Sequence, residues 1–197
     1  MNKKLIIGIV AAVAIIGGVI GIIALNSKKD GGESDGGSSY TKEVEAYMLK
    51  SATSDNKVKI ELAKELGFEM QSNVDGSLIL ENEKNGAKIT FYYEHKNDII
   101  MGERNYSSKV YYDYREFETA GRKSSEIKYN SKGEGEPFRI EYCTVFGQDE
   151  TDKRYDGVCI RFEKPSIAAD EPADIQALYD NEDVKHMLET LKFEKAE

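Results

Sequence analysis

The chain has 197 residues, of which 40% are hydrophobic and 32% are charged, and its formal net charge is −9 at pH 7. This composition is typical of a folding protein and excludes low-complexity and collagen-like chains. From Tyr40 onward the chain carries 23 basic and 33 acidic side chains, so it lacks the excess of lysine and arginine that nucleic-acid binding requires. We expect no nucleic-acid partner, and a single core, because about 158 residues suffice for one domain but not for two.

Leu5–Leu25 is an apolar segment long enough to cross a membrane. Its 21 residues carry no charge, and as a helix they would extend roughly 31 Å, close to the ~30 Å of a bilayer core. A cleaved signal peptide, the alternative, has an apolar region of about 7 to 15 residues. We therefore expect residues 1–29 to be an uncleaved transmembrane signal anchor. Gly17 and Gly21 have the small-residue spacing that permits a weak homodimer.

Lysines on both sides of this segment bear on its orientation. Lys3 and Lys4 precede it, and Lys28 and Lys29 follow it. The positive charges on its two sides are therefore nearly equal, and the positive-inside rule alone gives little preference for one orientation. A short basic amino terminus before an apolar run is what secretory targeting recognises, and long domains translocate regardless of charge. The prediction is a single-pass plasma-membrane protein with its amino terminus inside and its carboxy-terminal domain outside.

Residues 30–39 have the composition of a flexible linker. They comprise four glycines, three serines and three acidic residues, with no apolar side chain. Such a chain has a root-mean-square reach of only about 15–20 Å. The expected extracytoplasmic domain, residues 40–197, would therefore be held close to the membrane surface.

The beginning of this domain predicts one helix and one strand. In Thr41–Thr53 apolar side chains recur at helical spacing, at Val44, Tyr47, Met48 and Ala52. This pattern predicts a short amphipathic helix, and a disordered continuation of the linker is the alternative. Apolar residues then alternate in a way that predicts a strand over 57–62.

Ser77–His95 has the pattern of a β-hairpin. Asn85-Gly86 favours the two left-handed positions of a type I′ turn. A two-residue loop there would pair Leu80 with Phe91 and Leu78 with Tyr93. The apolar side chains would share one face, namely Leu78, Leu80, Ile89, Phe91 and Tyr93, and the polar ones the other, namely Glu81, Glu83, Lys88 and Thr90.

Phe138–Lys164 predicts a second hairpin, whose register follows from charge. One register pairs Arg139 with Glu163, Glu141 with Arg161, and Cys143 with Cys159. The same register places apolar side chains on the opposite face, at Ile140, Tyr142, Ile160 and Phe162. The loop would then be Asp149–Lys153.

The remaining patterns complete an α+β fold. Ile99–Met101, Lys109–Phe117 and Ser125–Asn130 alternate as strands, with a helix as the alternative for the second. After Pro172 the spacing becomes helical, at Ile175, Leu178, Tyr179, Val184, Met187, Leu188 and Leu191. The predicted architecture is an N-terminal transmembrane helix followed by a mainly antiparallel β-sheet domain with terminal helices packed on it.

The segment Leu188-Glu-Thr-Leu-Lys-Phe193 resembles the closing helix and strand of PsbP-like domains, in which an antiparallel sheet also precedes them. The resemblance covers most of residues 57–194. It implies a non-enzymatic accessory or binding domain that docks onto an assembly. It assigns no functional residue to this chain.

Cys143 and Cys159 are the two cysteines of the chain. An oxidising compartment favours a disulfide between them, although cross-strand Cβ atoms about 4.5–5.5 Å apart must approach to about 3.8 Å. Two free thiols are the alternative, which a cytoplasmic domain would favour. No metal-ligand spacing accompanies the pair, so we expect neither a metal nor a cofactor.

No catalytic motif stands out. His95 and His186, the two histidines, lie outside any ligand or triad spacing and are predicted to be ordinary surface residues. The acidic run in Asp149–Lys153 lacks the order of a calcium loop, and calcium binding there is a minor alternative. The run at 180–183 suits helix capping.

Tyrosines form the candidate binding surface. The chain has 12 of them, and alternate tyrosines of a strand must point away from the core. The candidate residues are Tyr92, Tyr106, Tyr111, Tyr112 and Tyr114. Tyrosine also suits half-buried strand positions without any binding role, which is the simpler explanation.

These features predict a membrane-anchored extracytoplasmic binding or accessory domain of the cell envelope. Its expected partners are the membrane, through residues 5–25, and an unknown envelope protein or wall polymer. A cell-envelope hydrolase is one alternative, and it requires convergent acid or nucleophile groups in a cleft. A glycan-binding module is the other, and it requires two or three coplanar exposed tyrosines.

Overall fold

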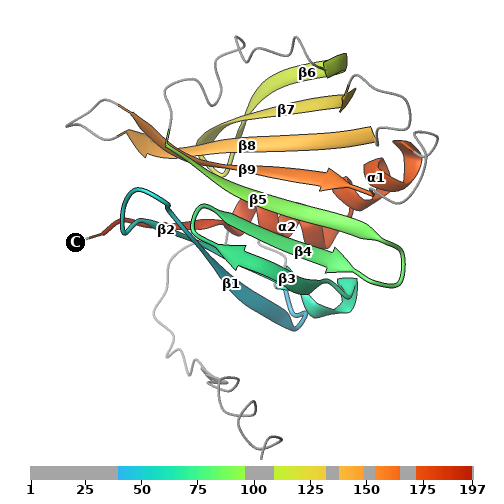
Figure 1. The fold of residues 1–197 in the computed structure, drawn as a ribbon, viewed down its shortest axis with the longest axis horizontal. Coiled ribbons are helices and arrows are strands. Elements are labelled where there is room, and N and C mark those ends of the chain that lie inside the picture. Colours follow the sequence, from blue (N-terminus) through green and yellow to red (C-terminus); the bar gives the residue numbers. More distant parts are fainter. Residues whose placement is uncertain (1–39, 96–108, 132–137, 149–153, 165–171, 197) are drawn as a thin grey trace, which may run out of the picture. The chain divides into compact units, whose positions relative to one another are not determined.

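The computed structural model describes residues 40–95, 109–131, 138–148, 154–164 and 172–196, all of which belong to the unit Tyr40–Glu197 (Figure 1). The elements in chain order are β1 (Val44–Lys50), β2 (Lys57–Ala63), the short 3-10 helix η1 (Lys64–Leu66), β3 (Glu69–Val74), β4 (Ser77–Asn82), β5 (Ala87–His95), β6 (Lys109–Thr119), β7 (Arg122–Ser131), β8 (Phe138–Gln148), β9 (Tyr155–Glu163), α1 (Pro172–Tyr179), α2 (Glu182–Thr190) and β10 (Lys192–Glu194). The fold is therefore mainly antiparallel β-sheet with two helices near the carboxy terminus, as the sequence predicts.

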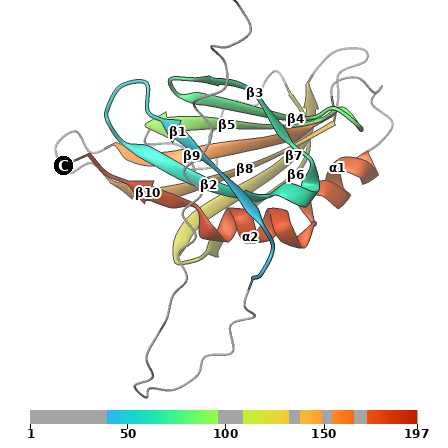
Figure 2. The same ribbon diagram turned by 90° about the horizontal axis from the view of Figure 1, so that it is seen from below.

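The described strands form two sheets. The large sheet has the order β3-β4-β5-β9-β8-β7-β6, and the small sheet has the order β1-β2-β10. The small sheet and the two helices lie on the same side of the large sheet (Figure 2). This arrangement gives the large sheet one covered face, which lines the core, and one opposite face.

The core fills the space between these layers. It combines buried side chains of the small sheet, such as Leu49 and Ile60, with those of the large sheet, such as Phe91 and Ile160, and with Met187 of α2. All five are inaccessible to solvent. Strands such as β4 and β9 contribute alternate residues, as a half-buried sheet requires.

The helix predicted for Thr41–Thr53 is wrong, because this segment contains strand β1. Its residues pair with β2 along its whole length, from Val44 opposite Ala63 to Lys50 opposite Lys57. Tyr47 and Leu49 thereby enter the core as alternate residues of a strand. Pairing with β2 and burial in the core outweigh the local preference for a helix. A segment this short can show helical spacing by chance. The strand predicted over 57–62 is confirmed as β2.

The first hairpin exists, but its register differs by two residues from the prediction. Leu78 pairs with Phe91 and Asn82 with Ala87, so the loop has four residues. Gly86 is left-handed, with a φ of +71°, but Asn85 is not, which excludes a type I′ turn. The Asn82 carbonyl accepts from the Gly86 amide at 2.8 Å and its side chain from the Lys84 amide at 3.0 Å. Glu83 thereby lies in the loop, and a shift of two keeps the side chains of the strands on their predicted faces.

The second hairpin has the predicted register. Arg139 lies opposite Glu163, Glu141 opposite Arg161, and Cys143 opposite Cys159. The apolar side chains predicted for the opposite face, Ile140, Tyr142, Ile160 and Phe162, are all buried in the core. Independent charge, apolar and cysteine patterns therefore define one register.

The other predicted elements fall into two groups. The strands predicted at 109–117 and 125–130 are confirmed within β6 and β7, which excludes a helix for the former. Both terminal helices are confirmed, and the Asn181 side chain caps α2 by accepting from the Asp183 amide at 2.8 Å. The predicted strand Ile99–Met101 and the loop Asp149–Lys153 lie outside the described residues.

Within the described ranges, neither helix is long and apolar enough to cross a membrane. The segment Leu5–Leu25, on which the prediction of an anchor rests, is not among these residues. The anchor and the linker therefore stay predictions from the sequence.

Candidate functional site

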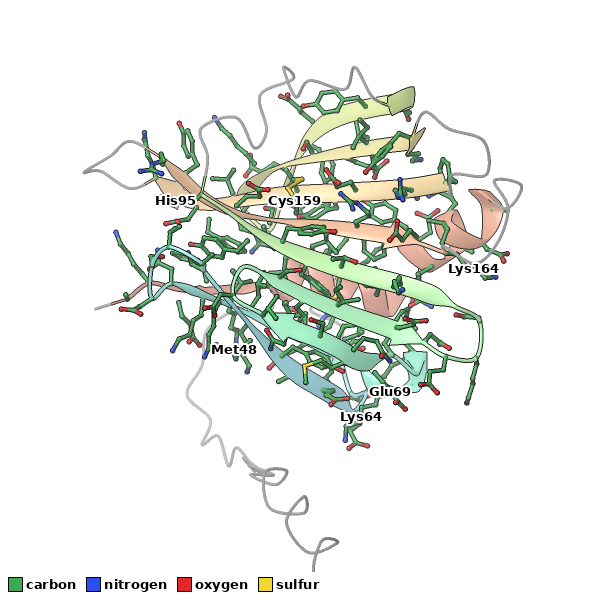
Figure 3. All side chains as sticks on the ribbon, viewed as in Figure 1. Met48, Lys64, Glu69, His95, Cys159 and Lys164 are labelled. Atoms are coloured by element: carbon green, nitrogen blue, oxygen red, sulfur yellow. A yellow bond between two sulfur atoms is a disulfide. The ribbon has the colours of Figure 1, made fainter. Side chains whose placement is uncertain are left out.

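The face of the large sheet opposite the core carries the two cysteines. Ile140 and Ile160 point into the core, so Cys143 and Cys159 point to the other side of the sheet. The two cysteines form a disulfide with Cα atoms 4.1 Å apart, which confirms the predicted pairing. Cys159 lies on β9, the central strand of the large sheet (Figure 3). We call this side of the sheet the disulfide face, defined by Tyr92, Glu141, Cys143, Cys159 and Arg161.

A charged and aromatic network lies beside the disulfide. The Arg161 guanidinium donates to the Glu141 carboxylate at 3.2 Å and to the Tyr92 hydroxyl at 3.0 Å. Its carbon stands 5.0 Å from the centre of the Tyr92 ring, which is a cation–π distance. The Tyr129 hydroxyl donates to the same carboxylate at 3.3 Å. Glu141 is almost fully buried, so these donors compensate a charge that burial would otherwise penalise.

The pKa values in this network follow from the same contacts. Burial alone would lower the pKa of the Arg161 guanidinium, but electrostatic interactions with Tyr129 and Glu141 raise it above its ordinary value. Burial raises the pKa of the Tyr129 hydroxyl, and the Glu141 charge raises it further. Both shifts keep the Arg161 guanidinium charged and the Tyr129 hydroxyl neutral beside the Glu141 carboxylate.

The structure does not bring the described candidate tyrosines together. Tyr92 is on β5 and Tyr114 on β6, both half-buried on the disulfide face. Three strands separate β5 from β6, which corresponds to about 19 Å between them. The Tyr114 hydroxyl donates to Glu116 at 2.6 Å. Tyr106 and the side chains of Tyr111 and Tyr112 lie outside the described residues, so their role stays a prediction.

A second polar cluster, which the sequence analysis missed, surrounds the buried carboxylate of Asp156 at the start of β9. The Tyr93 hydroxyl donates to one of its oxygens at 2.7 Å, and Nδ1 of His95 lies 2.5 Å from that same oxygen. The Asn56 amide donates to the other oxygen at 3.4 Å. His95, labelled in Figure 3, is largely buried, with 16% of its side chain exposed. Its prediction as an ordinary surface residue is therefore wrong.

The Asp156 cluster joins the two sheets. Asn56 belongs to the β1–β2 turn, and its side-chain oxygen accepts from the Ala196 amide at 2.9 Å. Burial raises the pKa of the Tyr93 hydroxyl, and the hydrogen bond to Asp156 adds to this effect. A carboxylate that fixes an imidazole is found in catalytic sites, where it orients a general base. It also occurs where no reaction takes place, so the pair alone defines no activity.

An open depression adjoins this cluster at the β1–β2 turn. It measures about 640 Å³, and polar or charged side chains form most of its lining, at Lys50, Ser51, Ala52, Thr53, Ser54, Asp55, Lys57 and Asp75. The positive charges of Lys50 and Lys57 are balanced there by the negative charges of Asp55 and Asp75. Such a lining differs from the apolar, enclosed pockets that hold most small-molecule ligands.

The described residues contain one group with metal-ligand atoms in proximity, formed by Glu141, Cys143 and Cys159 within 4.8 Å of one another. Because the two sulfur atoms are bonded to each other, neither is a thiolate that can bind a metal.

The run at 180–183 lies at the start of α2. Asn181 caps this helix as expected, and the Asp183 carboxylate accepts hydrogen bonds from Tyr40 and Lys42.

The comparisons with known proteins identify no family. A scan against protein-family models gives no match, and a search of curated proteins finds no similar sequence. Function is therefore inferred from the residues and their geometry.

Proposed function

We propose that this chain is a membrane-anchored, extracytoplasmic binding or accessory module of the cell envelope. The Cys143–Cys159 disulfide is the observation that carries the proposal, because such bonds persist in oxidising compartments and are rare in the cytosol. The apolar segment Leu5–Leu25 supplies the anchor in this proposal. Together they favour a single-pass protein with its carboxy-terminal domain outside.

The arrangement of buried polar groups supports a binding rather than a catalytic role. On the disulfide face, Glu141 is held by Arg161 and Tyr129, so the charge is already compensated within the protein. Arginine and tyrosine are also enriched at protein interfaces. Arg161 keeps 28% of its side chain exposed, and with Tyr92 it provides a rigid surface to which an envelope protein can dock.

The redox state of the cysteines in cells tests the proposal directly. The cysteines are 1% and 3% exposed, so reagents reach them poorly in the folded protein. Cells that express the full chain are therefore lysed in denaturant with excess N-ethylmaleimide, then reduced and labelled with a maleimide mass tag. Two added tags are expected. A chain fully blocked before reduction would overturn the extracytoplasmic location.

Topology is measured separately on exposed lysines. A membrane-impermeant amine reagent is applied to intact cells, with lysed cells as the control. Lys84 and Lys123, both exposed, are expected to react in intact cells. Reaction of these lysines only after lysis would place the domain inside and contradict the proposal, whatever the state of the cysteines.

One observation favours a second function, that of a cell-envelope hydrolase. The buried Asp156 fixes the imidazole of His95, which is how a general base is oriented. The test is release of soluble fragments from purified wall by the full chain and by its His95→Gln variant, with His186→Gln as the matched control. Activity lost only in His95→Gln would support this function, and absence of release by the unmodified chain would exclude it for that substrate.

A further inference from the structure

The outer face of the small sheet is unusually basic for this domain. Tyr47, Leu49, Val58 and Ile60 point into the core, so the residues that alternate with them point outward. The pairing of β1, β2 and β10 aligns the outward residues in two rows, Met48-Lys59-Lys192 and Lys50-Lys57-Glu194, with Ala46-Glu61 beside them. We call this surface the lysine face, defined by Lys50, Lys57, Lys59 and Lys192. Met48, labelled in Figure 3, belongs to it.

The charge of this face contrasts with the rest of the domain. It holds four lysines against two glutamates, whereas residues 40–197 hold 23 basic against 33 acidic side chains. Lys50 and Lys192 are exposed, and Lys59 keeps 32% of its side chain exposed. An anionic surface would therefore attract this face and repel the remainder, which orients the domain.

Lys59 forms an ion pair with Glu61 on this face, with 2.5 Å between the ammonium and the carboxylate. A hydrogen bond from Lys59 holds the pKa of Glu61 below its ordinary value, against the effect of burial. The charges of Lys59, Lys192 and His186 act in the same direction. Glu61 thus compensates the charge of Lys59, which leaves Lys50, Lys57 and Lys192 against Glu194 on this face.

The first described residues of the domain contact α2. The Tyr40 ring stacks on the His186 ring, with centroids 3.7 Å apart and planes at 14°. The Tyr40 hydroxyl donates to Asp183 at 3.1 Å, and the Lys42 ammonium lies 2.8 Å from the same carboxylate. These contacts fix the first residues of the domain to α2. The composition of residues 30–39, which precede them, predicts a reach of only about 15–20 Å.

We propose that the lysine face docks onto anionic phospholipid headgroups of the membrane that Leu5–Leu25 spans. The inference rests on the proposed anchor, since the anchor and a short linker confine the domain near the bilayer. Ammonium groups attract phosphate charges, and this attraction acts over about 10 Å at moderate salt. The small sheet would then face the membrane. The disulfide face, on the far side of the large sheet, would point away from the membrane and be accessible to partners.

The test is lysine reactivity of the full chain in lipid nanodiscs. One preparation contains phosphatidylcholine alone, and the other an equal mixture with phosphatidylglycerol. Acylation by an amine reagent is followed at each lysine by mass spectrometry. Lys50 and Lys192 are expected to react at least about threefold more slowly in the anionic discs. Lys84, exposed in the β4–β5 loop, and Lys123, exposed on β7, are expected to react at the same rate in both kinds of disc.

A pair of matched variants isolates the charge of the face. We also expect Lys57, which lies between Lys50 and Glu194 on this face, to react more slowly in anionic discs. In Lys50→Glu/Lys192→Glu this protection of Lys57 should disappear, whereas Lys84→Glu/Lys123→Glu should retain it. High salt should abolish the protection in the unmodified chain.

Each failure has a separate meaning. Equal reactivity in both discs would overturn the docking and leave the anchor intact. Protection that also includes Lys123 would show non-specific adhesion, and protection in both lipids would exclude a charge mechanism, so either overturns the proposal. Failure of the chain to enter nanodiscs would overturn the anchor and the docking together.

Discussion

Three buried acids of the described domain are each matched by a donor on a neighbouring strand. Glu126 accepts from Arg115 at 2.7 Å, Glu141 from Arg161 at 3.2 Å, and Asp156 from Tyr93 at 2.7 Å. All three carboxylates are at least nine-tenths buried. Because an unpaired buried charge is costly, removing one partner of such a pair destabilises a protein more than the net value of the pair suggests.

Asp156→Ala is expected to lower the free energy of unfolding by about 2–4 kcal/mol. The substitution leaves the Tyr93 hydroxyl, His95 and the Asn56 amide without their shared acceptor. Urea unfolding followed by circular dichroism measures the loss. Asp55→Ala, at an exposed position of the β1–β2 turn, is the control and should change stability by less than about 0.5 kcal/mol. Equal effects of the two substitutions would contradict a structural role for the cluster.

The lowered pKa of Glu126 predicts how the stability of the domain depends on pH. Burial alone would raise the pKa of this carboxyl, but hydrogen bonds from Arg115 and Tyr179 and the charges of Arg115 and Lys128 hold it below its ordinary value. A carboxyl whose folded pKa is depressed stabilises the protein above its unfolded pKa, about 4.3, and this contribution is lost as the pH falls through the folded pKa.

Glu126→Gln should therefore be less stable than the unmodified chain at pH 7, and the difference should shrink as the pH falls below about 4. Urea unfolding at a series of pH values measures it. Glu118→Gln, at an exposed position of β6, should leave the pH profile unchanged. A constant difference between Glu126→Gln and the unmodified chain across the acid range would contradict the lowered pKa.

The β8–β9 hairpin is the element that the disulfide constrains. The bond closes a sequence separation of 16 residues, for which the chain-entropy account gives about 3 kcal/mol. Cys143→Ala/Cys159→Ala should therefore lower the unfolding midpoint while keeping the fold, since Arg139–Glu163 and Arg161–Glu141 still define the register. Unfolding with and without reductant measures this. A variant as stable as the oxidised protein would show that the bond contributes nothing.

Sequence patterns predict this hairpin correctly and the β4–β5 hairpin only in part, for a physical reason. In β8–β9 three cross-strand pairs constrain the register independently. In β4–β5 the prediction rests on Asn85-Gly86 alone, while the hydrogen bonds of Asn82 close a longer loop. The core faces survive this error because the alternation has a period of two.

Strand β1 and the Asp156 cluster show where a sequence gives no local signal. The apolar spacing of β1 fits a helix, and its pairing with β2 decides otherwise. Asn56 and Asp156 are 100 residues apart, and no motif connects them. By contrast, the disulfide was predictable because both cysteines belong to one hairpin.

At the scale of the whole molecule, one core couples the two sheets. The same cluster of buried side chains includes residues of the small sheet, the large sheet and both helices. Arg122 of β7 adds a polar connection, because it donates to the carbonyls of Leu188 and Glu189 at 2.8 and 3.3 Å, near the end of α2. We therefore expect the sheets to unfold together.

Leu49→Ala tests this coupling, because Leu49 belongs to the small sheet and is fully buried. The expected loss is about 2–5 kcal/mol, and it should shift circular dichroism and tyrosine fluorescence to one common midpoint. Met48→Ala, on the outer side of the same strand, is the control and should cost far less. Separate transitions would show that the small sheet melts alone. A single transition means that the lysine face and the disulfide face belong to one cooperatively folded unit, so the proposed docking of the first would fix the direction in which the second is presented.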